Sequence, residues 1–165
     1  MTFLLRIMLQ VVRADFYNPI SQFIVRVTNP LVVPMRRLIP GRRGFDLPTL
    51  VVLVVLELIV TLVLLALNGA VPGVGVLLWL VIFRLIDLVI GTYLICIFVY
   101  VILSWIAQAS YSPFAMFLGQ IVEPVLRPAR RLIRPIGGLD VSPLIVMVLL
   151  MAASIALRDL MPLLM

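Results

Sequence analysis

The sequence has no histidine, no lysine and a single cysteine, and the absence of histidine excludes the most chemistry. Ser-His-Asp and Cys-His catalytic arrangements, HExxH zinc sites and histidine-ligated haem all need that side chain. Cys96 has no second cysteine with which to form an intrachain disulfide, and its apolar surroundings argue against a thiolate metal site. Because no nucleophile stands beside a candidate base either, we predict a protein that is not an enzyme and holds no metal or cofactor.

Charge is also scarce, at 12% of the 165 residues, whereas apolar residues make up 64%. The mean hydropathy is +1.28, and no soluble fold of this size hides so much apolar surface, so we predict an all-α membrane protein. All 13 basic residues are arginine, and the net charge is +6. Because the arginines flank apolar spans and have few interleaved aromatic residues, they indicate a cytoplasmic membrane face and no nucleic-acid partner.

Three apolar runs reach the roughly 20 residues that a bilayer-spanning helix needs: Leu50–Leu67, Val74–Ile106 and Pro143–Met165. A fourth run, Thr2–Val12, is too short to cross. Two loops are rich in arginine, whereas the connector Asn68–Gly75 has none. The positive-inside rule therefore predicts a multi-pass protein of the bacterial inner (cytoplasmic) membrane, with both basic loops cytoplasmic and the C-terminus outside.

One long segment occurs twice. Residues Tyr17–Leu50 recur 94 positions later as Tyr111–Leu144, and twelve of the 34 aligned positions are identical, among them prolines, arginines, a glycine (Gly44/Gly138) and an aspartate. Both copies have the same predicted orientation, so we expect two parallel repeats, residues 1–68 and 76–165, joined by an outer connector, residues 69–75. Tyr111 follows a long apolar helix but Tyr17 follows only 16 residues, so we expect the natural protein to carry about another half-helix upstream.

Each repeat is predicted to contain a membrane helix, a short interfacial amphipathic helix, a basic loop and a second membrane helix. The expected interfacial helices have apolar residues at helical spacing: Ile20, Phe23, Ile24 and Val27 in the first, and Phe114, Phe117, Leu118, Ile121, Val122 and Val125 in the second. Asn18 and Ser112 are suited to cap them, and Pro30 and Pro124 should end or kink them after about a dozen residues. The alternative is an ordinary connector packed on the end of the bundle.

The two basic segments share a P-x-R-R pattern that ends in Arg36-Arg37 and in Arg130-Arg131, the latter preceded by Arg127. These arginines are candidates for contact with anionic lipid phosphates or an acidic partner. The alternative is that they only set the topology. Asp46 and Asp140 are expected to cap the membrane helices that follow, with pairing to the nearby arginines as the other option.

Glu57 lies near the middle of a membrane span and needs a partner or water. Depth arithmetic places Glu57 and Arg6 both roughly 12 Å below the cytoplasmic surface, so we predict an intramembrane Arg6–Glu57 pair. Arg84 is a poorer match because it lies near the outer end of its helix. The pair is either a structural contact or an ion or proton site. Arg84 and Asp87 can pair at i, i+3 spacing.

The chain resembles the YggT family of small bacterial membrane proteins, related to the YlmG proteins. The resemblance rests on these motifs: Phe16-Tyr17-Asn18-Pro19 with Ser21-Gln22-Phe23, Thr28-x-Pro30-x-x-x-Pro34-x-Arg36-Arg37, Leu126-Arg127-Pro128-x-Arg130-Arg131, and Gly137-Gly138-x-Asp140-x-Ser142-Pro143. It implies an integral membrane protein with duplicated YGGT repeats. Bacterial members are associated with tolerance of osmotic shock, and photosynthetic relatives with cytochrome b6 maturation and with nucleoid organisation or division. The resemblance identifies no catalytic residue in this chain.

Two functions remain from these observations. The first is a non-enzymatic membrane scaffold, or an assembly or stress-tolerance factor, that contacts anionic lipid, a membrane-protein partner or a second copy of itself. The alternative is an oligomeric ion or solute channel or transporter in osmotic adaptation, for which Glu57 and Arg6 are the intramembrane indications.

Overall fold

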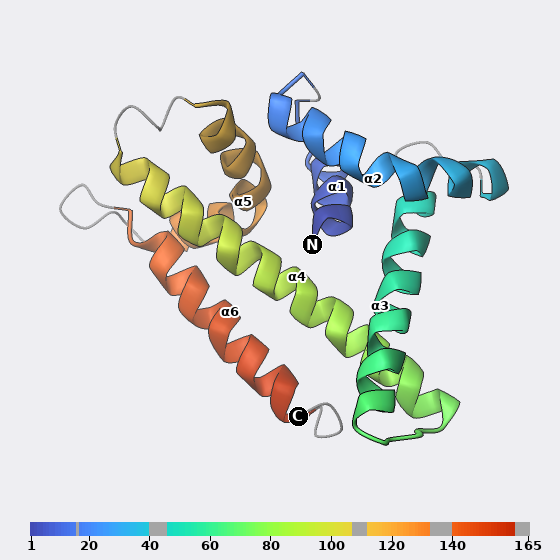
Figure 1. Ribbon diagram of the computed structural model, residues 1–165. Helices are drawn as coiled ribbons and strands as arrows, with labels where there is room; N and C mark the ends of the chain where they lie inside the picture. The colour runs from blue at the N-terminus through green and yellow to red at the C-terminus, as the bar shows by residue number, and fades with distance from the viewer. Residues whose placement is uncertain (16, 40–45, 107–111, 133–139, 161–165) are drawn as a thin grey trace.

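The computed structural model describes residues 1–15, 17–39, 46–106, 112–132 and 140–160. These residues form helices and no strands, which confirms the predicted all-α class (Figure 1). The helices are α1 (Thr2–Val11), α2 (Pro19–Leu38), α3 (Leu47–Leu67), α4 (Val74–Trp105), α5 (Pro113–Leu132) and α6 (Ser142–Asp159).

Within the described residues, three helices are long and apolar enough to cross a membrane: α3, α4 and α6, with mean hydropathies of 3.2, 2.5 and 1.7. They match the three predicted spans. Only 22% of each apolar window is buried inside the molecule, so most of this apolar surface faces outward. Helix α1 has ten residues, or roughly 15 Å, and is too short to span, as the sequence indicates.

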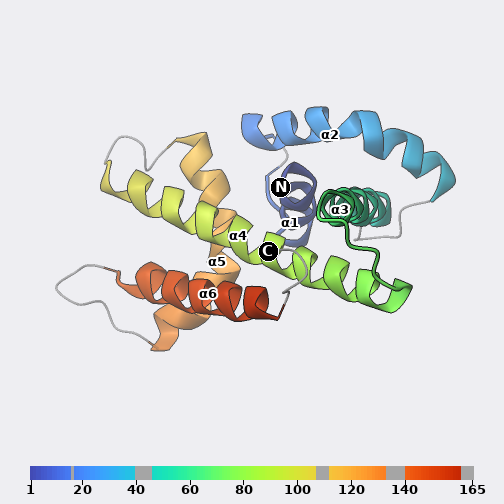
Figure 2. The same cartoon turned by 60° about the horizontal axis from the view of Figure 1, so that its bottom comes forward.

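Helix α4 lies at the centre of the helical bundle. It has 32 residues and packs against α3, α5 and α6, while α1 packs against α2 and α3. Helix α6 runs alongside α4 in both views, and α2 lies across the ends of α1 and α3 (Figures 1 and 2). The turn between α3 and α4 begins with Asn68 and Gly69, and Gly69 has a φ of 65°, a left-handed conformation that suits glycine at a helix end.

Helices α2 and α5 are longer than the sequence pattern suggests. Each has 20 residues and continues through its internal prolines, Pro30 with Pro34 and Pro124 with Pro128. A proline ring removes one backbone hydrogen bond and crowds the preceding turn, which bends a helix without necessarily ending it. Figure 2 shows α2 curving along its length. The paired arginines therefore lie in the last helical turn of α2 and of α5, not in loops.

The main hydrophobic core joins α1, α4 and α5, with contributions from α2, α3 and α6. Its centre includes Leu9, Ile97 and Ile121. The two predicted apolar stripes differ in burial: Phe117 of α5 is 2% exposed, whereas Phe23, its counterpart in α2, is 63% exposed. Helix α5 thus packs its apolar face on the bundle, and α2 leaves much of its apolar face uncovered.

Candidate functional site

Asn18 and Ser112 occupy the cap positions that the sequence predicts. The Asn18 side chain accepts a hydrogen bond from the Ile20 backbone N–H at 2.9 Å, and the Ser112 hydroxyl accepts one from that of Ala115 at 3.1 Å. Asn18 also donates to the backbone carbonyl of Pro113 at 2.6 Å. The start of α2 is therefore tied directly to the start of α5.

One arginine of each predicted pair is bound within the molecule. Arg36 Nη2 lies 2.9 Å from Asp46 Oδ2, and Arg130 Nε lies 2.8 Å from Asp140 Oδ2. The two pairs occupy equivalent positions in the duplicated segment, 94 residues apart. Each joins the last turn of an amphipathic helix to the start of the following apolar helix. This fixes the direction in which the arginine-bearing helix end points.

The neighbouring arginines are presented outward. Arg37, Arg127 and Arg131 are exposed, and none of them has a hydrogen bond or ion pair with another described residue. Arg42, Arg43 and Arg134 of the predicted basic loops lie outside the described residues, as do Gly44 and Gly138. Among the candidates for lipid or partner contact, these three described arginines are therefore available for binding.

Asp46 lies at the N-cap position of α3, but its side chain caps no backbone N–H. Instead, Asp46 Oδ2 accepts hydrogen bonds from Thr49 Oγ1 at 2.7 Å and Arg36, and forms an ion pair with Arg6 Nε at 3.4 Å. Burial alone would raise the pKa of Asp46, but the Thr49 and Arg36 hydrogen bonds and the arginine charges outweigh it and lower that pKa. The expected side-chain cap is wrong here, because two arginines and a threonine surround the carboxylate.

Asp140 combines the two expected roles. Its Oδ1 accepts from the Ser142 backbone N–H at 3.0 Å, and its Oδ2 binds Arg130, which also pairs with Glu123 Oε2 at 2.8 Å. Burial alone would raise the pKa of Asp140, but the hydrogen bonds from Ser142 and Arg130 and the arginine charge lower it. Burial would likewise lower the pKa of Arg130, but its hydrogen bonds to Asp140 and Tyr100 and the two carboxylate charges raise it.

Arg6 and Glu57 do not pair with each other, which corrects the sequence-based prediction. Arg6 is 6% exposed, and its Nη1 donates to Thr28 Oγ1 at 2.6 Å, Asn29 Oδ1 at 3.0 Å and the Val25 carbonyl at 3.4 Å. Depth arithmetic compares levels but does not say which face of a helix a residue occupies. Arg6 reaches toward α2 and the start of α3, whereas Glu57 lies on the face of α3 that meets α4.

The partner of Glu57 is Arg84, with Nε 2.7 Å from Glu57 Oε1. The sequence carries a signal for this pair that the depth argument missed. Glu57 is ten residues from the end of α3 at Leu67, and Arg84 is ten residues from the start of α4 at Val74. Counted from the turn that joins the two helices, both residues lie at the same level, roughly 15 Å along.

Asp87 pairs with α6 and not with Arg84 on its own helix. Asp87 Oδ1 accepts from Ser154 Oγ at 2.6 Å, and its Oδ2 lies 3.4 Å from Arg158 Nη2. The predicted i, i+3 pair is therefore wrong, because Arg84 and Asp87 point to different neighbouring helices. Each tethers α4 to one neighbour, Arg84 to α3 and Asp87 to α6.

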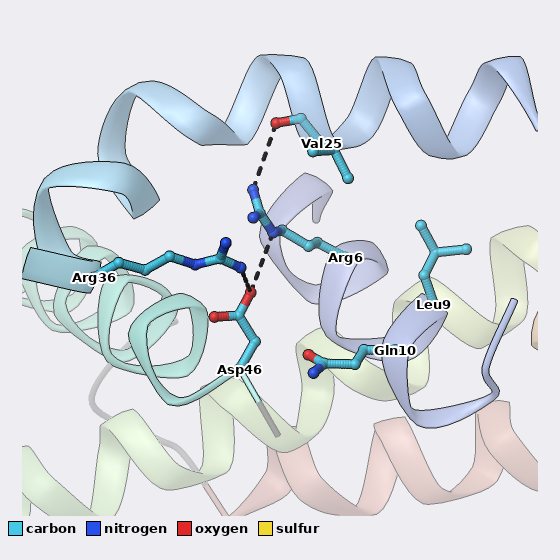
Figure 3. A pocket seen from close by; sticks show the side chains of 6 residues that line it. All are labelled: Arg6, Leu9, Gln10, Val25, Arg36 and Asp46. Carbon is cyan, nitrogen blue, oxygen red and sulfur yellow. Dashed lines mark hydrogen bonds and ion pairs between the residues drawn. The ribbon is translucent and has the colours of Figure 1, made fainter. Parts of the chain in front are cut away.

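A cavity of about 240 Å³ lies among α1, α2 and the start of α3. It is lined by Arg6, Leu9, Gln10, Val25, Arg36 and Asp46 (Figure 3). No group of three histidine, cysteine, aspartate or glutamate residues among the described parts of the chain is placed to hold a metal ion. The chemistry of this region is therefore that of guanidinium groups, amides and a carboxylate.

The helices and charge pairs define an all-helical protein with at least three helices able to cross a membrane and two arginine-bearing helices beside them. The CCB3/YggT family model matches residues 1–67 and 79–161, and the chain belongs to that family. This confirms the resemblance seen in the sequence motifs.

Relatives in several bacteria support the assignment. The chain is 38% identical to YggT of Escherichia coli K12 over 159 residues, covering 96% of this chain and 82% of YggT. It is 45% identical over 146 residues to PA0392 of Pseudomonas aeruginosa, covering 86% of this chain and 73% of the relative. A Vibrio alginolyticus protein from the proC 3′ region is 42% identical over 162 residues, covering 96% and 86%. No solved structure matches the chain.

Proposed function

We propose that this protein is a non-enzymatic integral scaffold or assembly factor of the bacterial inner membrane, using its arginine-bearing helix ends to contact anionic lipid or a partner protein. One observation carries the proposal: Arg36 forms an ion pair with Asp46, and Arg130 forms the equivalent ion pair with Asp140. A helix end held in this way presents its next arginine in a defined direction. Setting the topology alone would need the charges but not these fixed positions.

The surface of α2 supports an interfacial role for that helix. Phe23, Val27 and Leu31 are 63%, 50% and 49% exposed, and together they form one apolar stripe at helical spacing. Polar Gln22 and Arg26 lie on another side of the same helix. A helix with this pattern lies in the membrane interface with its apolar face toward the acyl chains and its arginines toward the phosphates. The packed face of α5 favours the connector alternative for the second helix.

The charge pairs favour a scaffold over a channel. Glu57 is bound by Arg84, and Arg6 is bound by Asp46 and by α2. An ion or proton pathway needs polar groups that face water along a route through the membrane. These groups instead face one another between helices. The outward apolar surfaces of α3, α4 and α6 suit lipid, a membrane-protein partner or a second copy of this chain. A role in osmotic tolerance fits this proposal.

The triple variant Arg37→Gln/Arg127→Gln/Arg131→Gln tests the scaffold. It should purify with less anionic lipid and partner protein per mole, measured by mass spectrometry, and should fail to restore survival of osmotic shock in a deletion strain that the wild type rescues. Arg13→Gln removes an exposed arginine elsewhere and is the matched control. Solute flux in liposomes that is abolished by Glu57→Ala would contradict the scaffold and support the channel.

A further inference from the structure

We propose that the cavity lined by Arg6, Arg36 and Asp46 is a binding site for a phosphate group, carried either by an anionic phospholipid or by free inorganic phosphate. This goes beyond the proposed scaffold, which uses the outward arginines, because it assigns a ligand class to the cavity. The two can fail separately, because the scaffold is tested by substituting Arg37, Arg127 and Arg131, and none of these lines the cavity.

The charge balance of the cavity points to an anion. Among the described residues, the charged groups at this site are two guanidiniums and one carboxylate, which leaves one positive charge. Arg6 is 6% exposed, so part of that excess is held away from bulk water. An unbalanced charge away from water is costly, and a bound anion removes the imbalance. The cavity volume of about 240 Å³ is sufficient for a phosphate group.

The lining has the chemistry that binds phosphate. Arginine side chains present several N–H donors in a planar fork, which matches the oxygens of a phosphate. Arg6 and Arg36 come from different helices and converge on the same carboxylate oxygen of Asp46, as Figure 3 shows. Gln10 adds an amide at the wall, and Leu9 and Val25 give apolar surface beside it. Since Arg6 is held by Thr28 and Asn29, its guanidinium is oriented before any ligand arrives.

The second half of the chain has the opposite charge balance at the equivalent place. Tyr100 stands where the 94-residue offset places Arg6, and Glu123 stands where it places Asn29. Arg130 is accordingly flanked by two carboxylates, Asp140 and Glu123. In the described part of this region, the ion-paired cluster of one arginine and two carboxylates carries a net negative charge and would repel phosphate. The phosphate site therefore belongs to the first half alone, although the two halves share the arginine–aspartate pair.

The test uses the full-length protein in detergent, freed of lipid and phosphate, and follows its melting temperature. Two probes are added separately: inorganic phosphate, and phosphatidylglycerol in mixed micelles with phosphatidylcholine as the zwitterionic reference. A ligand that binds only the folded state raises the melting temperature in a concentration-dependent way. At least one probe should do so. Phosphatidylglycerol alone would identify a lipid headgroup, and inorganic phosphate would identify the free anion.

Arg36→Gln should weaken the apparent affinity for the effective probe by about tenfold, because it removes a charge-assisted hydrogen bond. Arg13→Gln removes an exposed arginine outside the cavity and should leave that affinity unchanged. Arg6→Gln should act like Arg36→Gln, but Arg36, being half exposed, is the variant expected to stay folded. The proposal is overturned if neither probe stabilises the wild type, or if Arg36→Gln and Arg13→Gln respond alike.

Discussion

Glu57 and Arg84 show what a single charge needs in an apolar helix. Each lies in a predominantly apolar helix, and their side chains meet at 2.7 Å between α3 and α4. Their exposed fractions, 12% and 25%, mean that little solvent shields either charge. Removing one partner leaves the other without compensation, whereas removing both leaves an apolar contact between the helices.

We therefore predict that substituting one residue of this pair destabilises the protein, and that substituting both restores most of the stability. Glu57→Leu should lower the free energy of unfolding by about 3 kcal/mol, because it leaves Arg84 unpaired. Glu57→Leu/Arg84→Leu should recover most of that loss. The measurement is reversible unfolding in mixed micelles. As a control, Arg6→Leu combined with Glu57→Leu should give additive losses, since these residues do not touch. Strong coupling between Arg6 and Glu57 would contradict the pairing described above.

The carboxylate of Asp46 makes the stability of the folded state depend on pH. Its pKa is lower in the folded protein than in the unfolded chain, where an aspartate titrates near pH 4 (about 3.9). The folded state therefore binds fewer protons than the unfolded state in that range. The contribution of Asp46 is complete above about pH 4, and it is lost as the pH falls through the lower folded pKa.

Asp46→Asn should accordingly reduce the melting temperature at pH 7 and flatten its decline below about pH 4. The two curves should converge at the acidic end, because a protonated Asp46 no longer pairs with Arg6 and Arg36. Thermal scans in a non-ionic detergent across this range would measure the effect. Asp159→Asn, an exposed carboxylate at the end of α6, is the control and should follow the wild type. Parallel curves for Asp46→Asn and the wild type would exclude this role.

At the scale of the helix, the same residue has opposite surroundings in α2 and α5. Phe23 and Phe117 are identical positions of the duplicated segment, yet one is 63% exposed and the other 2%. Helix α5 lies against the core formed with α1 and α4, whereas α2 covers the ends of α1 and α3 (Figure 2). Hydrophobic periodicity therefore predicts an apolar face in both helices but not what covers it.

This difference predicts unequal costs for the same substitution. Phe117→Ala should lower the free energy of unfolding by about 3 kcal/mol, because it opens a cavity in the core. Phe23→Ala should cost less than about 1 kcal/mol in detergent. Denaturant titrations of both variants would compare them directly. In lipid nanodiscs, Phe23→Ala should increase the solvent accessibility of α2, measured by hydrogen exchange, if α2 lies in the interface. Equal costs in detergent would contradict the burial difference.

At the scale of the molecule, the distribution of arginine predicts the orientation. Leu38, at the end of α2, should face the cytoplasm, and Gly73, in the arginine-free connector, should face outside. Gly73 tolerates a side chain, because an added Cβ would meet nothing within 4 Å. The buried Cys96 can be replaced by serine to give a cysteine-free background.

In that background, Gly73→Cys should react with a membrane-impermeant thiol reagent added to spheroplasts. Leu38→Cys should react only after the membrane is permeabilised. Labelling is measured by the mass shift on a gel or in the mass spectrometer. The Cys96→Ser protein without an added cysteine is the control for nonspecific labelling. The reverse pattern would show that the arginine-bearing end of α2 lies outside.

Sequence patterns identified much of this architecture. Apolar length located α3, α4 and α6, and side-chain chemistry located the caps at Asn18 and Ser112. The prolines predicted the ends of helices poorly, because α2 and α5 both continue through their internal prolines. The charge partners were mostly missed: Arg6 was assigned to Glu57, and Arg84 to Asp87. The division into two repeats stays a prediction from the duplicated sequence.

The sequence predicted the helices but not the charge partners, and the reason is physical. Whether a segment forms an apolar helix depends on its own residues and on the solvent, so composition and periodicity suffice to locate it. Which charge meets which depends on how each helix is rotated and crossed, and those angles come from packing between distant segments. The sequence alone required that Glu57 and Arg6 be compensated within the membrane protein. Only the tertiary structure decided that Glu57 would meet Arg84, and that Arg6 and Arg36 would share Asp46 at the wall of a positively charged cavity.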